Sequence, residues 1–276
     1  MKKSINIGVI GNRDFKEGLK IIKEAGFEAV ELNYTEEMEK KGKEYIKSLR
    51  DTVLREGLEI ASLLTGQFWQ YPLTSNNPEK RKKGEDLLTR SIEVCEIFET
   101  DALLVVPGVV GTLWSSEERV QYDVAYERAQ ESIRKVVPLA EKKGVYICVE
   151  NVWNKFLLSP VEMKRFVEEI DSEYVAVYFD VGNILVIGYP EDWIRILGRK
   201  IKRIHLKDFK LSVGNIGGFC DLLEGDVNWQ EVIKALKEVG YNSYLTAEIG
   251  PYKQFPETVI YNTSLAIDKI LGRKDD

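Results

Sequence analysis

Four ionisable side chains stand where apolar, strand-like segments of the sequence end. Glu150 closes the run VYICVE, Asp180 closes YVAVYFD, His205 lies in IKRIHLKD, and Glu248 lies in SYLTAEI. Three carboxylates and one imidazole form a ligand set suited to a single divalent ion. They can meet only if the strands that carry them are neighbours in a parallel sheet or barrel. The sequence therefore predicts both a metal site and a fold that brings these strand ends together.

The ligand types narrow the choice of metal. Hard carboxylate oxygens with one imidazole suit manganese, magnesium, cobalt or zinc, and the lack of thiolate ligands argues against a structural zinc site. Taken singly, each residue could be a polar group that merely ends a strand. His205 is the only histidine of the chain, and its position among apolar neighbours at a strand end, in register with three carboxylates, favours the metal interpretation.

Four glycines occupy equivalent places along the chain. Gly26, Gly57, Gly144 and Gly240 each follow a charged helical stretch and precede a β-rich run. Glycine is favoured at this place because the residue after a helix commonly adopts a left-handed conformation. Each of the four segments is therefore expected to be a helix end followed by a strand.

Further apolar runs complete an alternation of strands and helices. Strands are also expected at residues 5–10, 101–106, 175–180 and 202–207, which makes eight in all, and charged periodic segments such as 36–54 and 78–98 are long enough for crossover helices. Eight strand–helix units predict an α/β fold, the (β/α)8 TIM barrel, as one domain over residues 1–276. An open doubly wound sheet is disfavoured, since the turn after the first strand reads GNRDFKEG and lacks G-x-G-x-x-G.

Composition excludes several classes of protein. The chain has 276 residues, 44% of them hydrophobic, and a formal net charge of −6, so a broad basic face for nucleic acid is not expected. No apolar run is long enough for a membrane span and the first residues do not resemble a signal peptide, which predicts a cytoplasmic protein without a membrane partner. Cys95, Cys148 and Cys220 show no paired spacing and are expected to be buried thiols.

Five residues are weaker candidates for substrate binding. Asn183 follows Asp180 by three positions and could hydrogen-bond a ligand hydroxyl or simply form a turn. Lys207 could bind an oxyanion or form a surface ion pair with Asp208 or Glu248. Glu31 could reach the pocket or satisfy a backbone amide, and Trp114 and Trp153 could wall a sugar pocket or pack under loops.

At these residues the chain resembles the sugar-phosphate isomerase/epimerase superfamily with the xylose isomerase-like barrel, over essentially its whole length. The runs FDVGN, IHLKDFK, EGDVNW and LTAEI follow the order and spacing of that family. In its ketose 3-epimerases and xylulose-5-phosphate 3-epimerases, a glutamate, an aspartate, a histidine and a second glutamate hold one divalent ion. The resemblance places this set at Glu150, Asp180, His205 and Glu248. It also implies a homo-oligomer.

Two positions depart from the tagatose-type 3-epimerases. Those enzymes usually carry a histidine where this chain has Asn183 and a glutamate where it has Phe156, and the asparagine resembles the phosphopentulose epimerases instead. Lys155, Lys207, Lys210 and Arg13 are the candidate partners for a phosphate, and phosphorylated and free sugars both stay open. The apurinic endonucleases of the superfamily need many histidines for a multinuclear zinc site, so this activity is disfavoured for a chain with one histidine.

The resemblance implies a metal-dependent isomerase that acts on a ketose, a ketose phosphate or a related keto acid. The ion would stabilise a cis-enediolate, with Glu150 and Glu248 as acid and base on opposite faces of the substrate. Transfer across two faces inverts a stereocentre, whereas transfer between adjacent carbons interconverts aldose and ketose. A metal-dependent hydrolase and a non-catalytic sugar-binding barrel are the alternatives.

Overall fold

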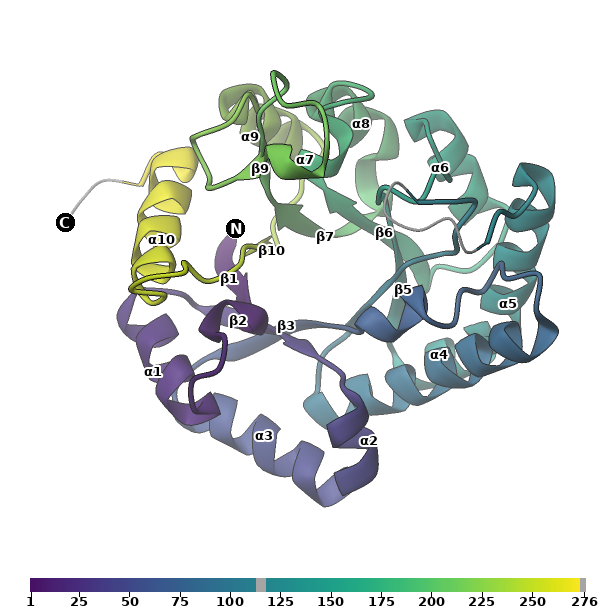
Figure 1. Ribbon diagram of the computed structural model, residues 1–276, viewed down its shortest axis with the longest axis horizontal. Coiled ribbons are helices and arrows are strands. Elements are labelled where there is room, and N and C mark those ends of the chain that lie inside the picture. Colours follow the sequence, from purple (N-terminus) through teal and green to yellow (C-terminus); the bar gives the residue numbers. More distant parts are fainter. Residues whose placement is uncertain (113–117, 274–276) are drawn as a thin grey trace.

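Parallel strands close into a barrel at the centre of the molecule, and helices surround it (Figure 1). The computed structural model describes residues 1–112 and 118–273, and within them eight strands form the barrel in the order β1-β10-β7-β6-β5-β4-β3-β2. These strands are β1 (Lys2–Asn6), β2 (Ala29–Asn33), β3 (Glu59–Leu64), β4 (Ala102–Val105), β5 (Tyr146–Glu150), β6 (Val175–Asp180), β7 (Ile201–Leu206) and β10 (Tyr244–Ala247). The predicted (β/α)8 TIM barrel is confirmed.

Helices connect successive strands on the outside of the barrel. The α-helices are α1 (Phe15–Glu24), α2 (Glu36–Lys41), α3 (Lys43–Arg55), α4 (Pro78–Phe98), α5 (Tyr122–Lys143), α6 (Pro160–Glu168), α7 (Val181–Ile184), α8 (Pro190–Leu197), α9 (Trp229–Glu238) and α10 (Thr258–Leu271). Short 3-10 helices are η1 (Ile7–Ile10), η2 (Gly66–Trp69), η3 (Gly198–Lys200) and η4 (Ile216–Gly218), and β8 (Asp208–Phe209) pairs with β9 (Phe219–Cys220) in a small antiparallel ribbon.

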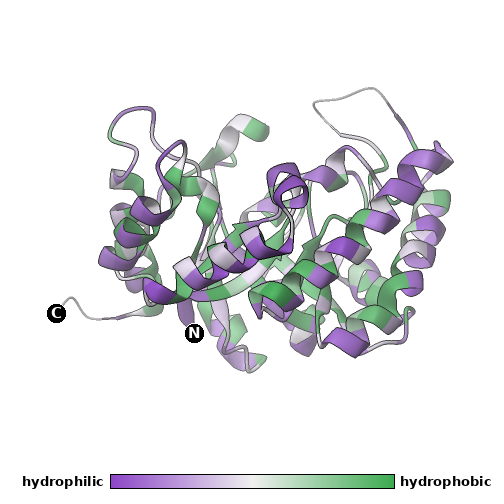
Figure 2. Cartoon of the chain, turned by 90° about the horizontal axis from the view of Figure 1, so that it is seen from below, coloured by the Kyte–Doolittle hydropathy of each residue, from purple (hydrophilic) through white to green (hydrophobic). Residues whose placement is uncertain are grey.

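The barrel strands are buried on both faces. Every residue of β6 is buried, and so are four of the five residues of β5. Because helices cover the outside and side chains fill the inside, such strands read as continuous apolar runs rather than as alternating patterns. Figure 2 shows the strands as largely hydrophobic, with hydrophilic residues distributed over the surrounding helices.

The glycine pattern of the sequence is confirmed in the backbone. Gly26, Gly57, Gly144 and Gly240 have φ angles of 88°, 73°, 68° and 75°. At Gly144 the backbone N–H bonds to the carbonyls of Ala140 and Glu141 and closes α5. A β-carbon would cost energy at such angles, so these positions end the helices and turn the chain toward the next strand.

Two predicted elements have different bounds in the structure. The strand expected at residues 5–10 is wrong at residues 7–10, which form η1: β1 spans Lys2–Asn6, and the Asn6 side chain accepts the N–H of Gly8 and starts the turn. The helix expected over residues 36–54 is broken into α2 and α3 at Gly42, which has φ 80°. At Asn6 a side-chain cap outweighs the apolar pattern, and at Gly42 a glycine with positive φ interrupts the charged helical periodicity.

The remaining expectations from composition can be compared with the described residues. Nowhere in residues 1–112 and 118–273 is there a helix that combines the length and the apolar character needed to cross a bilayer. All three cysteines are free; Cys95 and Cys148 are buried as predicted, whereas Cys220 is only partly buried because it lies on the short ribbon strand β9. Trp114 lies outside the described residues.

Strand order and register decide where the four candidate ligands lie. Asp180 on β6 pairs with His205 on β7, and His205 pairs with Thr246 on β10, two residues before Glu248. Glu150 on β5 pairs with Tyr178 on β6. The barrel strands all run parallel, so their carboxyl ends meet at one mouth of the barrel, where the active sites of this fold are built.

We expect Gly144→Ala to destabilise the protein by about 1 kcal/mol, because the left-handed conformation is costly for residues with a β-carbon. No heavy atom lies within 4 Å of the added carbon, so the backbone angle alone sets the cost. Gly66→Ala is the control, since its β-carbon also meets open space and its φ is not left-handed. Urea unfolding measures both variants, and equal midpoints would contradict the argument.

Candidate metal centre

The barrel brings the four predicted ligands together. Glu150, Asp180, His205 and Glu248 each offer one ligand atom, and these atoms all lie within 4.8 Å of one another. His205 and Asp180 are fully buried, Glu150 is nearly so, and the side chain of Glu248 is 35% exposed. The cluster is therefore closed on the barrel side and open at Glu248, toward the mouth.

The atoms of this cluster point at a common centre. His205 Nδ1 lies 3.3 Å from Glu248 Oε2, 3.4 Å from Glu150 Oε1 and 3.8 Å from Asp180 Oδ2. His205 Nδ1 is buried and has no hydrogen-bond partner in the described part of the chain. It faces three carboxylate oxygens, of which Asp180 Oδ2 and Glu248 Oε2 also contact the Lys207 ammonium. Buried polar atoms are normally satisfied, and an unpartnered imidazole nitrogen that faces three carboxylates fits a bound divalent cation. The residues present can thus hold such an ion.

Burial and neighbouring charges shift the pKa values of these four groups in opposite directions. Burial raises the pKa of Glu150 to about 7 and also raises the pKa of Asp180. Burial would raise the pKa of Glu248 too, but Lys207 and His205 outweigh it and hold that pKa below its usual range. For His205, burial works toward a lower pKa, and the Glu31 carboxylate overcomes it, so the pKa lies well above its usual value. The cluster favours positive charge at its centre.

Lys207 is the cation that the chain itself supplies. Its Nζ lies 2.5 Å from Glu248 Oε2 and 3.1 Å from Asp180 Oδ2, and its side chain is 21% exposed. Of the two pairings weighed from the sequence, Glu248 is observed and Asp208 is not among its ion pairs. Lys207 therefore borders the open side of the cluster, next to the ligand oxygens and within reach of the mouth.

Asn151 connects the ends of β5 and β6, a role that the sequence did not suggest. Its side-chain amide donates to the carbonyl of Asp180 at 2.7 Å, and its side-chain oxygen accepts the N–H of Asp180 at 2.9 Å. The carboxylate Oδ1 of Asp180 in turn accepts the N–H of Asn183 and caps α7. These bonds leave Oδ2 of Asp180 directed at the cluster. In the sequence, the only sign of this role is that Asn151 directly follows Glu150.

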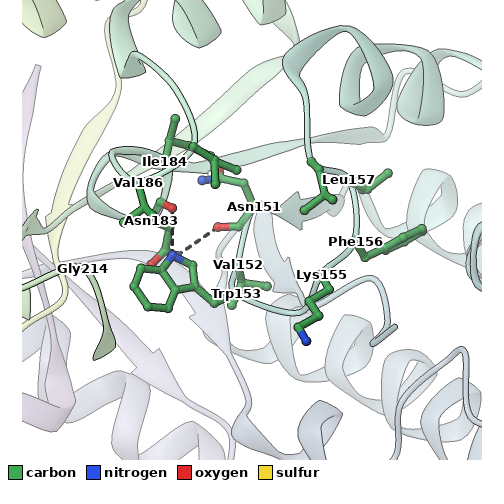
Figure 3. A pocket seen from close by; sticks show the side chains of 12 residues that line it. Asn151, Val152, Trp153, Lys155, Phe156, Leu157, Asn183, Ile184, Val186 and Gly214 are labelled. Carbon is green, nitrogen blue, oxygen red and sulfur yellow. Dashed lines mark hydrogen bonds between the residues drawn. The ribbon is translucent and has the colours of Figure 1, made fainter. Parts of the chain in front are cut away.

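Two of the candidate substrate-binding residues, Asn183 and Trp153, form hydrogen bonds near the point where Asn151 joins β5 to β6. The Asn183 side chain is buried and donates to the carbonyl of Asn151 at 2.9 Å, and the Trp153 indole donates to the carbonyl of Asn183 at 2.9 Å. Figure 3 shows Trp153 and Asn183 side by side in a pocket of about 170 Å³ that Asn151, Phe156 and Leu157 also line. Trp153 further packs against Phe209 and Phe219.

Asp208 holds the long loop after β7, another role that sequence reasoning missed. Its carboxylate accepts the backbone N–H groups of Leu223 and Val227 and the indole N–H of Trp229. A β-carbon on Gly225 would lie 2.1 Å from this carboxylate. The runs IHLKD and EGDVNW, which are separate in the sequence, are thus two halves of one packed unit at the mouth.

Glu31 lies beneath the cluster rather than in the mouth. It is fully buried in β2, and its Oε1 lies 2.8 Å from His205 Nε2. Neither sequence interpretation of Glu31 anticipated this contact with the ring nitrogen opposite to Nδ1, the atom that faces the cluster.

The phosphate candidates have different surroundings. Arg13 pairs with Glu257, Lys210 pairs with Glu224 at 3.3 Å, and Lys155 lines the pocket of Figure 3. Phe156, the second departure from the tagatose-type pattern, is buried against other aromatic rings, those of Tyr122, Tyr126 and Phe166.

Comparison with known proteins shows which family model the chain matches and which curated proteins are similar to it. The model of the xylose isomerase-like TIM barrel family matches residues 19–267. A putative L-ribulose-5-phosphate 3-epimerase from Haemophilus influenzae is 26% identical over 247 residues, which are 86% of this chain and 84% of that protein. An inosose dehydratase from Geobacillus thermodenitrificans is 23% identical over 230 residues, 72% of this chain and 74% of that protein.

A solved structure shows the same fold. A D-psicose 3-epimerase from Clostridium cellulolyticum, determined with D-tagatose, superposes with a TM-score of 0.81 over 99% of both chains at 18% sequence identity. At this identity the likeness concerns the course of the chain, and the assignment of residues must come from the geometry above.

We expect Asp180→Asn to abolish binding of divalent metal, because the amide removes the charge of a fully buried candidate ligand. Mn²⁺ at about 100 times its Kd should stabilise the wild-type protein by about 2.7 kcal/mol and the variant by nearly nothing. Thermal unfolding with and without Mn²⁺ measures this. Asp192→Asn is the control, since Asp192 is exposed on α8; equal Mn²⁺ responses of Asp180→Asn and wild type would contradict the assignment.

Proposed function

This chain belongs to the xylose isomerase-like TIM barrel family, and on that premise we propose that it is a divalent-metal-dependent epimerase or isomerase of a ketose or ketose phosphate. The observation that carries the proposal is the cluster itself, in which Glu150 and Glu248 flank the metal-facing atoms of Asp180 and His205. The names of its relatives, among them a putative ribulose-phosphate epimerase, support the same class of reaction. Related keto acids belong to the same chemical class of substrate.

Each ligand has its own part in this proposal. A bound divalent ion would act as a Lewis acid toward the substrate carbonyl and its neighbouring hydroxyl. Asp180 and His205 are the two fully buried members and serve to hold the ion. Glu150 and Glu248 lie on β5 and just after β10, on either side of β6 and β7 in the barrel order, and so approach a substrate from different sides.

The two glutamates move the proton. One carboxylate removes the carbon-bound proton next to the carbonyl, and the other returns a proton to the opposite face of the planar intermediate, which inverts the stereocentre. Delivery to the adjacent carbon instead would interconvert ketose and aldose. Glu248 is the better connected to the mouth, since it is the more exposed of the two, and Lys207 keeps it ionised through the contact at 2.5 Å.

Lys207 also serves the substrate in this proposal. Its ammonium borders the carboxylates on the open side, so a substrate oxygen entering from the mouth meets a fixed positive charge. A preorganised charge of this kind stabilises negative charge that develops on oxygen during proton removal. The aromatic group of Trp153, Phe209 and Phe219 lies alongside and limits the access of water.

The experiment that tests the function follows solvent deuterium into the substrate. The metal-loaded protein is incubated in deuterated water with pentuloses, hexuloses, their phosphates and keto acids, and NMR reports exchange at each carbon. Exchange at one carbon with formation of its epimer supports the proposal and identifies the sugar. Release of phosphate would indicate a hydrolase, loss of one water molecule a dehydratase, and binding without any exchange a non-catalytic barrel; each would overturn the proposal.

We expect Glu150→Gln and Glu248→Gln each to lower epimerisation by about 100- to 10,000-fold, the usual contribution of a positioned acid or base. Because the two carboxylates act on opposite faces, each variant should still exchange deuterium into one epimer, and the two variants should prefer different epimers. Metal content is measured in parallel. Full epimerase activity in either metal-loaded variant would refute the assignment of that glutamate.

A further inference from the structure

Glu31 is an ionisable group that the proposed mechanism does not use, although it is fully buried in the barrel interior. Its Oε1 accepts a hydrogen bond from Asn6 Nδ2 at 2.8 Å and lies 2.8 Å from His205 Nε2. Its Oε2 accepts from the Tyr178 hydroxyl at 2.6 Å and from the Ser62 hydroxyl at 2.8 Å. Both oxygens thus have two partners each, contributed by different strands of the barrel.

The three neighbours other than His205 all offer protons to this carboxylate. The Asn6 amide nitrogen is a donor only, and the hydroxyls of Tyr178 and Ser62 can both turn their protons toward the charge. A carboxylate in such surroundings is an acceptor on every side. A lone pair on His205 Nε2 would face the negative Oε1 at 2.8 Å and be repelled, so Nε2 carries a proton and donates it to Glu31.

The proton on Nε2 decides what the other ring nitrogen can do. A neutral imidazole with Nε2 protonated has its lone pair on Nδ1, the atom that faces Glu150, Asp180 and Glu248. In this tautomer, Nδ1 is the only ring nitrogen whose lone pair can bind a metal. The opposite tautomer would direct an N–H at the cluster and leave no donor atom for the ion.

The orientation of the ring is held by the same set of residues. The rings of Tyr178 and His205 are in contact, with centroids 4.4 Å apart and planes inclined by 53°. Tyr178 therefore packs on the imidazole and bonds the carboxylate that bonds the imidazole. Glu31 on β2, Tyr178 on β6 and His205 on β7 are fixed relative to one another across the barrel.

We propose that Glu31 is the positioning residue of the metal centre: its carboxylate holds the proton on His205 Nε2, so that Nδ1 is presented to the ion. The inference rests on the metal site proposed above and adds the group that prepares one of its ligands. Glu31 does not touch the ion or the substrate. It acts through His205, in the manner of carboxylates that orient metal-binding histidines from behind.

The first test compares metal affinity in Glu31→Gln and wild type. The amide oxygen of the variant can still face His205, while its NH₂ group faces the Tyr178 and Ser62 hydroxyls, which can rotate to accept; we therefore expect a folded protein. Loss of the charge should weaken Mn²⁺ and Zn²⁺ binding by about 10- to 100-fold. Free Mn²⁺ is followed by its EPR signal, and Zn²⁺ by competition with a coloured chelator.

Glu59→Gln is the matched control. Glu59 is a carboxylate at the start of β3, where it accepts from Lys2 and Tyr244 at the opposite rim of the barrel. It resembles Glu31 in bridging strands but has no contact with the ligand cluster among its hydrogen bonds. Its variant should bind both metals as tightly as wild type.

A second readout follows the proton itself. His205 is the only histidine, so ¹⁵N-histidine labelling gives the signals of one ring, and Zn²⁺ loading keeps the sample diamagnetic. In the wild type, long-range ¹H–¹⁵N correlations should show a protonated Nε2 and an unprotonated Nδ1. In Glu31→Gln the Nε2 proton resonance should move upfield and exchange faster with water, which a purely structural contribution of Glu31 would not cause.

The outcomes separate this inference from the function. If the wild type binds metal but Glu31→Gln binds it within twofold and keeps the same Nε2 proton signal, the role of Glu31 is refuted and the metal site stands. If the wild type binds neither metal, both proposals fail. Should Glu31→Gln not fold, the ¹⁵N spectrum of the Zn²⁺-loaded wild type still tests the inference, and an unprotonated Nε2 of His205 there refutes it.

Discussion

The concentration of negative charge at one end of the barrel is the constraint on which the rest of the structure depends. Glu150, Asp180 and Glu248 converge on one imidazole, and the carboxylate of Glu31 lies behind it. Carboxylates are costly to bury together unless positive charge or hydrogen bonds compensate them. The chain supplies Lys207 and His205, and a divalent ion would supply the remainder.

A closed parallel barrel is well suited to hold such a cluster. Glu150, Asp180 and His205 stand on three different strands and Glu248 directly follows a fourth, β10, and backbone hydrogen bonds between neighbouring strands prevent the carboxylates from moving apart. Polar side chains restrain the segments that follow the strands. Asn151 joins the ends of β5 and β6 by hydrogen bonds, and Asp208 accepts hydrogen bonds from the loop after β7. The apolar surroundings strengthen every one of these interactions, because they lower the local dielectric constant.

The two departures from the tagatose-type pattern are explained by this scaffold. Asn183 uses its side chain to bond the backbone of Asn151, and Phe156 is packed among aromatic rings away from solvent. At both positions the chain has a side chain that stabilises a loop of the mouth. In the proposed function, the selection of the sugar would therefore depend on other groups of the mouth, such as Lys207, which contacts Asp180 and Glu248.

The sequence by itself determined the alternation of elements and the four positions of the candidate ligands. Left-handed glycines after helices and apolar runs ending in Glu150, Asp180 and His205 are local signals, and strand length and helix caps depend mostly on residues near in the chain. The same reasoning failed at residues 7–10, where the Asn6 cap starts a 3-10 turn, and at Gly42, where a glycine with positive φ breaks the helix.

Only the tertiary structure decided how the remaining residues combine. Glu31 precedes His205 by 174 positions and precedes Tyr178 by 147, yet barrel closure makes all three neighbours. Asn151 and Asp208 likewise act on partners that no local pattern names. Hydrogen bonds of this kind depend on strand order and register, which arise from packing the whole barrel, so a carboxylate in a strand could be recognised from sequence while its partner could not.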